Sequence, residues 1–400
     1  MNIKILYLIQ FLAVFINPVL GLIVTLISAS QRAVLPIALA FSLALILVYM
    51  PVMYDVAHSY FEFHDYLSGI NDYHLHIINQ IAYYLSFAGF EYYSIVLLIC
   101  FFSLYFWFKM FEEVSINVSN YTHYLLLLVI FLMALSYKEV MDLNRTFFSY
   151  ISAVFGIFLI TKTDGKRFFG VLAIITSIYF HSSSLVIIVP YILSRYCVLN
   201  TWSSVALLFT SLTIGMNGAL LKLLILPHLP EGDFYSYIVS ERWGLIETIE
   251  LGHWLLWLIQ IFITTSLFVI SVKNKDRKAR SMYIYVASFF LIFIQYRVFG
   301  ERFFIAVVLM IPLILSNSSI KRDTILILLV VVATKFFVYN FYLFGYVFTS
   351  SYDYVVPSSD QRLEYIMKPF YYPAFSLINI GSNGYSDLFL LENAIRRNAQ

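Results

Sequence analysis

The sequence predicts an all-α, polytopic helical membrane protein. Apolar residues make up 61% of the 400-residue chain, charged residues make up only 12%, and the mean hydropathy is +0.83. A soluble domain carries roughly 25% charged residues, so this composition requires a lipid environment. The length has room for about ten spans of roughly 20 residues each. The net charge of +2 and the lack of a basic, aromatic platform argue against nucleic acid as a partner.

Long apolar runs predict about ten full spans and one interrupted pair. The predicted spans are 3–28, 33–53, 91–111, 121–137, 146–161, 201–226, 251–272, 281–299, 302–316 and 324–348. A further run, 168–193, is interrupted by four polar residues that begin at His181.

Basic loops set the predicted topology. The three densest clusters are 162–167, 273–280 and 321–322, and all should lie in the cytosol. This is possible only if 168–193 enters and leaves on the same side, as two half-helices that meet at His181. Broken helical backbone at membrane depth needs protein or a water-filled cavity around it, so the break is also a candidate site. The resulting map has a transmembrane domain over 1–348, outer loops at 54–90 and 227–250, and a C-terminal outer-face tail over 349–400.

Two outer segments near the start of the chain carry polar side chains. The loop 54–90 holds Asp55, Tyr60 and several His residues, but no spacing typical of a metal site, so no metal and no cofactor are expected. Aromatic polar loops of this kind bind sugars and lipid headgroups, and Tyr is also common at bilayer interfaces. The segment from Lys138 to Arg145 includes Glu139 and Asp142; it is either a snorkelling rim or part of a site.

Two later segments carry further candidates. The loop 227–253 is long enough to cover an outer cavity and contains Arg242, a candidate ligand for sugar. Arg297, Glu301 and Arg302 join two apolar spans with almost no loop between them. Charges so close to hydrocarbon face a cavity or one another, and a structural Glu–Arg pair is the simplest alternative to a site. Guanidinium groups bind phosphate well because their planar fork pairs with two oxygens at once.

The order of these features resembles the Wzy/EpsG-type polysaccharide polymerases. The resemblance lies in the polar aromatic loop Pro51–Tyr66, in Arg145 ahead of Thr146-Phe-Phe-Ser-Tyr, in Tyr179-Phe-His-Ser-Ser and in Arg302-Phe303. It covers most of residues 33–315. It implies a membrane architecture similar to the GT-C class of glycosyltransferases, which use lipid-linked sugars.

The resemblance implies an inverting glycosyltransferase in the bacterial inner membrane. Such an enzyme polymerises oligosaccharide repeats carried on undecaprenyl pyrophosphate, at the periplasmic face, for O-antigen, capsule or exopolysaccharide assembly. Its partners would be the lipid-linked oligosaccharide, membrane lipid, and a chain-length regulator and flippase of the same pathway.

Each candidate residue has an expected role in such a glycosyl transfer. Arg145 and Arg302, supported by Arg297, would bind the pyrophosphate, where negative charge develops as the glycosyl bond breaks. His181 is a candidate base for the acceptor hydroxyl, a phosphate ligand, or a structural cap. The carboxylates that could be the base, or orient an Arg, are Asp55, Glu139, Asp142 and Glu301. Tyr60 and Arg242 would contact sugar. We expect Arg145, His181 and Arg302 to share one hollow.

Other membrane functions remain as alternatives. An O-antigen ligase, or another membrane glycosyl or acyl transferase, would share the long outer loop and the arginines. A lipid-linked oligosaccharide flippase would show internal repeats and charges near the midplane, and the sequence shows no convincing self-similarity between its halves.

Overall fold

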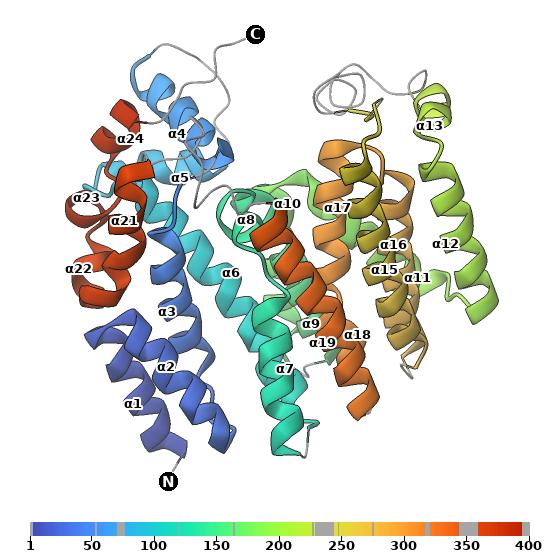
Figure 1. The fold of residues 1–400 in the computed structure, drawn as a ribbon, viewed down its shortest axis with the longest axis horizontal. Helices are drawn as coiled ribbons and strands as arrows, with labels where there is room; N and C mark the ends of the chain where they lie inside the picture. Colours follow the sequence, from blue (N-terminus) through green and yellow to red (C-terminus); the bar gives the residue numbers. More distant parts are fainter. Residues whose placement is uncertain are drawn as a thin grey trace. The chain divides into compact units, whose positions relative to one another are not determined.

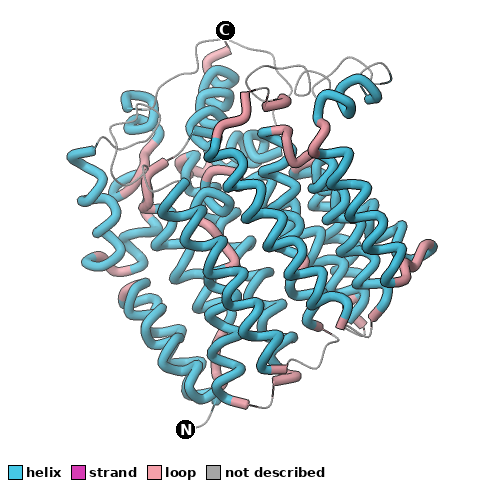
Figure 2. The backbone as a smooth tube through the Cα atoms, turned by 45° about the vertical axis from the view of Figure 1, so that its right-hand side comes forward, coloured by secondary structure: helices cyan, strands magenta, loops and turns pink. Residues whose placement is uncertain are grey.

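The computed structural model describes residues 3–52, 54–69, 77–118, 120–162, 165–225, 228, 244–246, 248–273, 276–316, 321–343 and 359–393. Regular structure in these ranges is helical, apart from an isolated antiparallel bridge between Leu245 and Tyr296 (Figures 1 and 2). The prediction of an all-α chain is therefore confirmed for the part of the chain that the structure describes.

Five stretches of helix are long and apolar enough to cross a membrane, within the described ranges. They are α6 (Tyr92–Ser115), Asn144–Thr161 of α9 (Asn144–Lys162), α15 (Leu251–Val272), Arg297–Leu315 in α17 (Arg297–Leu309) and α18 (Ile311–Leu315), and Arg322–Tyr342 in α19 (Arg322–Phe337) and the π-helix η4 (Val338–Leu343). Each coincides with a predicted span. The chain is thus a helical membrane protein by the length and composition of these helices.

Within the described ranges, the other predicted spans contain shorter or divided apolar helices. The run 3–28 is two helices, α1 (Ile3–Ile16) and α2 (Pro18–Ser28), because Pro18 cannot continue the first helix and the Asn17 side chain caps the second. The run 201–226 likewise divides into α12 (Thr201–Gly215) and α13 (Gly218–Ile225).

Three more predicted spans contain one helix of 13 or 16 residues each. They are α3 (Pro36–Val48), α7 (Tyr121–Met133) and α16 (Arg277–Ile292). At 1.5 Å per residue, 13 residues rise only about 20 Å, which is less than the hydrocarbon thickness of about 30 Å. Hydropathy alone therefore overestimated the length of these helices.

The predicted break at His181 is present. Helix α10 (Arg167–Phe180) ends there, a 3-10 turn η2 (Ser182–Ser184) follows, and α11 (Leu185–Tyr196) begins directly after it. The His181 amide still donates to the Ser177 carbonyl at 3.1 Å, so the α-helical hydrogen bonding stops at this residue. A re-entrant path for this pair stays a prediction.

The chain forms two compact units. The first comprises residues 1–152, 176–182 and 336–400. Inside it, α3 packs along α6 and α2, and α2 packs along α1 (Figure 1). It also contains α4 (Tyr54–Leu67), α5 (Ile77–Ser86), α7, α8 (Tyr137–Met141), the first part of α9, η4, α21 (Ser359–Tyr371), α22 (Ala374–Ile378), α23 (Ile380–Asn383) and α24 (Asp387–Asn393).

The C-terminal helices α21 to α24 belong to this first unit. The Tyr49 hydroxyl donates to the Leu377 carbonyl at 2.8 Å, and the Tyr385 hydroxyl donates to the Met50 carbonyl at 3.0 Å. The side-chain Nδ2 of Asn17 donates to the carbonyls of Pro369 and Tyr372. The described part of the segment that the sequence analysis set apart as a tail is thus hydrogen-bonded to the N-terminal helices.

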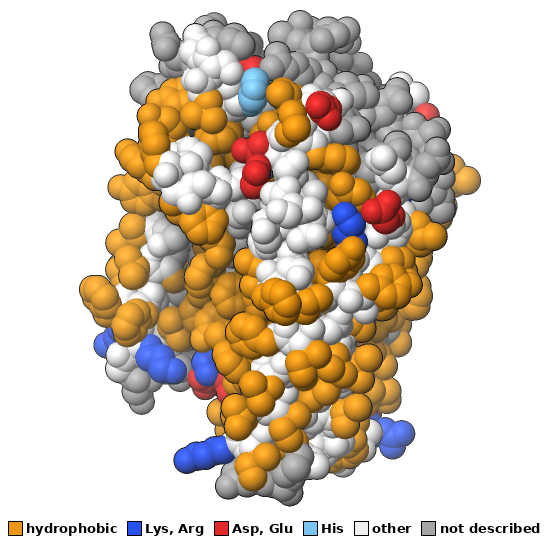
Figure 3. All heavy atoms as spheres, turned by 90° about the vertical axis from the view of Figure 1, so that its left-hand side faces the viewer, with side chains coloured by type: hydrophobic (Ala, Val, Ile, Leu, Met, Phe, Trp, Pro, Cys, Tyr) orange, Lys and Arg blue, Asp and Glu red, His pale blue; other side chains and the backbone are white. Residues whose placement is uncertain are grey.

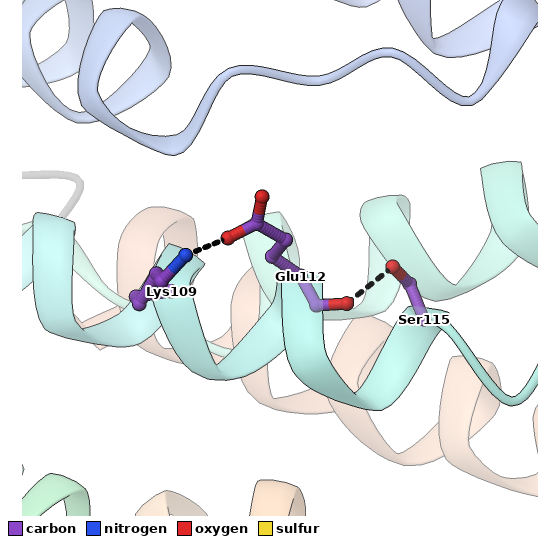
Figure 4. Close-up of polar contacts among 3 residues, drawn as sticks. All are labelled: Lys109, Glu112 and Ser115. Atoms are coloured by element: carbon purple, nitrogen blue, oxygen red, sulfur yellow. Dashed lines mark hydrogen bonds and ion pairs between the residues drawn. The ribbon is translucent and has the colours of Figure 1, made fainter. Parts of the chain in front are cut away.

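Helix α6 carries an ion pair towards its C-terminal end. Lys109 pairs with Glu112 one turn further along, and the Ser115 hydroxyl donates to the Glu112 carbonyl at 2.8 Å (Figure 4). These groups satisfy one another on the helix itself. They are therefore part of the helix end and not of the site described below.

The second unit comprises residues 153–175 and 183–335, and α16 is its centre. Helix α16 contacts α11, α12, α15, α17 and α18, and most of its side chains are buried. Helix α12 approaches it closely at Gly215, where a Cβ atom would lie 1.8 Å from the Leu291 carbonyl oxygen. Only glycine allows this approach.

Candidate functional site at the start of α8 and α9

Two buried carboxylates lie on or beside the short helix α8. The side chains of Glu139 and Asp142 are only 4% and 6% exposed. Glu139 forms a capping box with Ser136: its carboxylate accepts from the Ser136 amide at 3.0 Å, while the Ser136 hydroxyl accepts from the Glu139 amide. Snorkelling side chains would reach solvent, so these positions do not fit a simple snorkelling rim.

Asp142 also positions the start of α4. Its Oδ1 atom accepts a hydrogen bond from the Asp55 amide at 2.8 Å. The Tyr137 hydroxyl donates to the Pro51 carbonyl just before this helix. Of the predicted residues, Asp55 and Asp142 are therefore brought together, Asp55 is half-buried, and Glu139 lies three residues before Asp142.

Arg145 lies three residues further on, in the first turn of α9. The guanidinium is half-buried, and it makes no hydrogen bond or ion pair with a residue that the structure describes. A cation at a helix N-terminus opposes the helix dipole, so Arg145 does not stabilise α9 electrostatically. The Tyr92 hydroxyl, which donates to the Asn79 side chain at 3.2 Å, lies within electrostatic range of Arg145.

His181 lies beside the same face of α9. The Ser149 hydroxyl donates to the His181 carbonyl at 3.0 Å, and the rings of Phe148 and Phe180 are 4.4 Å apart. Ser149 is one helical turn after Arg145 and so shares its face. The imidazole of His181 is half-buried. The structure thus places the backbone of the α10–η2 break one turn from Arg145 along α9.

An apolar cavity of about 290 Å³ adjoins α8. Its lining comes from α3, α6, the end of α7, α8 and the end of α19 with η4, and includes Leu43, Phe108, Val140 and Phe341. The Tyr137 amide donates to the Asn340 side chain at 2.8 Å, which joins α8 to the π-helix η4. Helix α8 thus carries Glu139, is followed directly by Asp142, and lines a cavity whose wall is mostly apolar.

The remaining predicted residues lie elsewhere. Tyr60 is buried, and its hydroxyl donates to the Asp387 carbonyl at 2.6 Å, so it packs inside the first unit and is not open to a sugar there. Arg297, Glu301 and Arg302 are in the first turns of α17 in the second unit; Arg297 is exposed and the other two are half-buried.

The hollow that Arg145, His181 and Arg302 are expected to share would involve residues of both compact units. Arg145 and His181 belong to the first unit and Arg302 to the second, so the hollow stays a prediction. Arg242 lies outside the described residues.

Sequence reasoning missed a carboxylate pair formed by Glu91 and Asp387. The Asp387 amide donates to the Glu91 carboxylate at 2.7 Å, and the Asp387 carboxylate accepts from the Tyr92 amide at 2.9 Å. Burial, together with the nearby charge of Glu91, raises the pKa of Asp387 to about 6. No local pattern could have paired two residues that are 296 positions apart.

On the face that Figure 3 shows, most carboxylates and a histidine lie towards the upper end, where a basic side chain is also present, and most basic side chains lie towards the lower end. Among the described residues, no group of three His, Cys, Asp or Glu side chains is placed to hold a metal ion.

Comparison of the chain with protein-family models, with curated proteins and with solved structures gives no match.

Proposed function

We propose that the chain is an inverting glycosyltransferase of the bacterial inner membrane that polymerises lipid-pyrophosphate-linked oligosaccharide repeats at the periplasmic face. The proposal includes a GT-C-like architecture with about ten crossings. Some of these crossings would be made by pairs of shorter helices, and α10 and α11 would form the re-entrant pair. Undecaprenyl pyrophosphate would be the carrier of both donor and acceptor.

The observation that carries the proposal is the position of Arg145. A half-buried guanidinium with no described counter-ion, at the start of a membrane-length helix, is suited to bind an anion that arrives from outside the protein. Buried carboxylates lie within a few residues of it, on and beside α8. The apolar cavity along α8 supports the same proposal, since a polyprenyl chain needs a hydrocarbon surface next to its phosphate.

The proposed reaction is one displacement at the anomeric carbon. A carboxylate, with Asp142, Asp55 and Glu139 as the candidates in the first unit, removes the proton from the acceptor hydroxyl. The hydroxyl oxygen attacks the anomeric carbon as the bond to the pyrophosphate oxygen breaks. Arg145 stabilises the negative charge that develops on the leaving pyrophosphate. A single displacement inverts the configuration, and the protonated carboxylate then releases its proton to water.

Other predicted residues keep supporting roles in this proposal. His181 could act as the base or donate a hydrogen bond to a phosphate oxygen, since an imidazole ring can accept or donate a proton. In the second unit, Arg297 and Arg302 provide further guanidinium groups, and Glu301 provides a further carboxylate. Arg242 remains a candidate ligand for sugar.

Deletion of the chain in its host, with the surface polysaccharide separated on a gel, tests the function. Loss of a polymerase leaves one repeat on the lipid core. Loss of a ligase leaves none, and loss of a flippase leaves repeats on the cytosolic leaflet. A single attached repeat is the result that the proposal requires, and either of the other two patterns would overturn it.

Substitution of Arg145 tests the site. We expect Arg145→Ala to lower the rate of polymer formation about 10- to 100-fold at unchanged protein level, which corresponds to loss of an interaction of about 1.5–3 kcal/mol with a charged group. Arg145→Lys should restore little, because an ammonium group lacks the planar fork. Arg322→Ala is the matched control, since this exposed arginine also begins a membrane-length helix. A full polymer ladder from Arg145→Ala would exclude Arg145 as a phosphate ligand.

A further inference from the structure

A second cavity lies wholly within the second unit and has a different chemistry. Its volume is about 370 Å³, and its wall includes the basic side chains of Arg167, Arg195 and Lys278. Asp276 is the one acidic side chain among the lining residues. The lining therefore has an excess of two positive charges. Nothing in the proposed glycosyl transfer uses this cavity.

The acidic residue is turned towards the protein backbone. Asp276 caps α16, and its Oδ1 atom accepts from the amides of Lys278 and Ala279 at 3.0 and 3.1 Å. The N-terminus of α16 adds the positive end of a helix dipole on this side of the cavity. The carboxylate thus serves the helix start, and the three cations set the sign of the field in the cavity.

Arg195 is held in place on the cavity wall. Its guanidinium lies 4.8 Å from the centre of the Tyr191 ring and donates to the Tyr191 hydroxyl at 2.9 Å. The tyrosine oxygen accepts this hydrogen bond, so its own hydrogen can be donated to an anion. A pre-positioned arginine and a hydroxyl donor side by side form a suitable pair of ligands for phosphate oxygens.

The surroundings of the cavity are those of a membrane interface. Phe168 and Phe169 follow Arg167 and are 73% and 62% exposed, and Tyr196 follows Arg195 and is 85% exposed. Aromatic side chains with this exposure, next to basic ones, are typical of the headgroup level of a bilayer. The deeper wall is apolar and includes Ile157, Ile160 and Leu313. A ligand with a phosphate and an attached hydrocarbon part fits both surfaces.

We propose that this cavity binds the phosphate of an anionic phospholipid headgroup, with Arg195, Lys278 and Arg167 as its ligands and the exposed aromatic side chains against the acyl chains. Basic pockets between membrane helices bind anionic headgroups in this way. The positive-inside pattern of the sequence places the lipid in the cytosolic leaflet. The cavity is thus a lipid site separate from the site at α8 and α9.

Binding to the full-length chain in mild detergent tests the proposal. The chain is titrated with phosphatidylglycerol, with phosphatidylcholine, and with soluble glycerol phosphate, and bound molecules are counted by native mass spectrometry. Thermal unfolding provides a second readout, since a ligand that binds the folded state raises the melting temperature. We expect phosphatidylglycerol to bind most tightly, with glycerol phosphate weak because it lacks the acyl chains.

The decisive variant is Arg195→Gln with Lys278→Gln. Affinity for phosphatidylglycerol should fall roughly 30-fold, since each basic residue near an anionic lipid contributes about fivefold. Lys273→Gln with Arg322→Gln is the matched control, because both residues are exposed, basic and outside the cavity wall, and binding should be unchanged. Arg195→Lys with Lys278→Arg keeps the net charge and one guanidinium, so it should lose much less affinity than the Gln pair, which separates loss of charge from loss of folding.

Three results would overturn the proposal. Equal losses in the cavity variant and the control would show general attraction of lipid to a basic surface. Equal binding of phosphatidylcholine would show that the phosphate charge is not recognised. Glycerol phosphate that binds as tightly as the lipid would assign the cavity to a soluble phosphorylated ligand.

Discussion

Replacing Asp387 by Asn should change how the stability of the protein depends on pH. The carboxylate of Asp387 accepts from the Tyr92 amide and lies against the carboxylate of Glu91, while its own amide donates to Glu91. An Asn side chain has the same shape and can accept from Tyr92 and donate to Glu91. The variant therefore keeps these contacts and removes only the charge.

The direction and the size of the change in stability with pH follow from the pKa of Asp387. Burial, the largest cause, together with the Glu91 charge, raises the pKa of Asp387 from 3.8 to about 6, so the folded state favours the protonated acid. The group stabilises the fold fully below pH 3.8, and this stabilisation is lost as the pH rises through about 6. The change corresponds to about 3 kcal/mol, and to about 1–2 kcal/mol after allowance for solvent screening of a side chain that is partly exposed.

The measurement is thermal unfolding in detergent between pH 4.5 and pH 7.5. As the pH rises through this range, the melting temperature of the unsubstituted chain should fall relative to that of Asp387→Asn. At the upper end of the range the variant should be the more stable of the two. Glu392→Gln is the matched control, because Glu392 is an exposed carboxylate on the same helix. Parallel pH profiles for the unsubstituted chain and Asp387→Asn would show that Asp387 does not titrate in this way.

Two further substitutions test packing and the α8 site. Gly215→Leu should lower the melting temperature by several degrees, because the Cβ atom of the leucine would overlap the Leu291 carbonyl and overpacking costs about 1–3 kcal/mol or more. Gly252→Leu is the control, because position 252 is open, and this variant should keep the melting temperature. Equal losses in the two variants would contradict the close approach of α12 to α16. Glu139→Gln should keep the melting temperature, since Gln also completes a capping box, but it should lower the rate of polymer formation. Ser136→Ala should instead lower the free energy of unfolding by about 1 kcal/mol. Full activity of Glu139→Gln would exclude Glu139 as the base.

The sequence was informative where the signal is local. The all-α class follows from composition, and the interruption of 168–193 follows from a run of small polar residues at His181 in apolar surroundings. Five predicted spans correspond to membrane-length helices for the same reason. The break at Asn17–Pro18 was also present in the sequence, but a hydropathy window averages over one proline and joins the two helices on either side of it.

The parts of the fold that depend on distant contacts could not be predicted. The resemblance does not extend to the C-terminal segment, yet this segment is bound through Tyr49 and Tyr60, which donate hydrogen bonds to it. Tyr60 was expected to face sugar, and its burial results from α24, which packs on α4 and is more than 300 residues away. Exposure of a residue is decided by whichever segment covers it, and that segment is not encoded in the neighbouring sequence.

The two acids on and beside α8 add a second argument to the one that rests on Arg145. A capping box needs only a side chain that accepts hydrogen bonds, and Gln serves as well as Glu at position 139. An Asn at position 142 could accept from the Asp55 amide in the same way. Burying an ionised carboxylate costs more than burying an amide, so amides would serve the capping box and the bond to Asp55 at a lower cost. An acid can take up a proton from a hydroxyl, whereas an amide cannot. The higher cost of burying two carboxylates is therefore explained if this part of the first unit accepts a proton during the reaction.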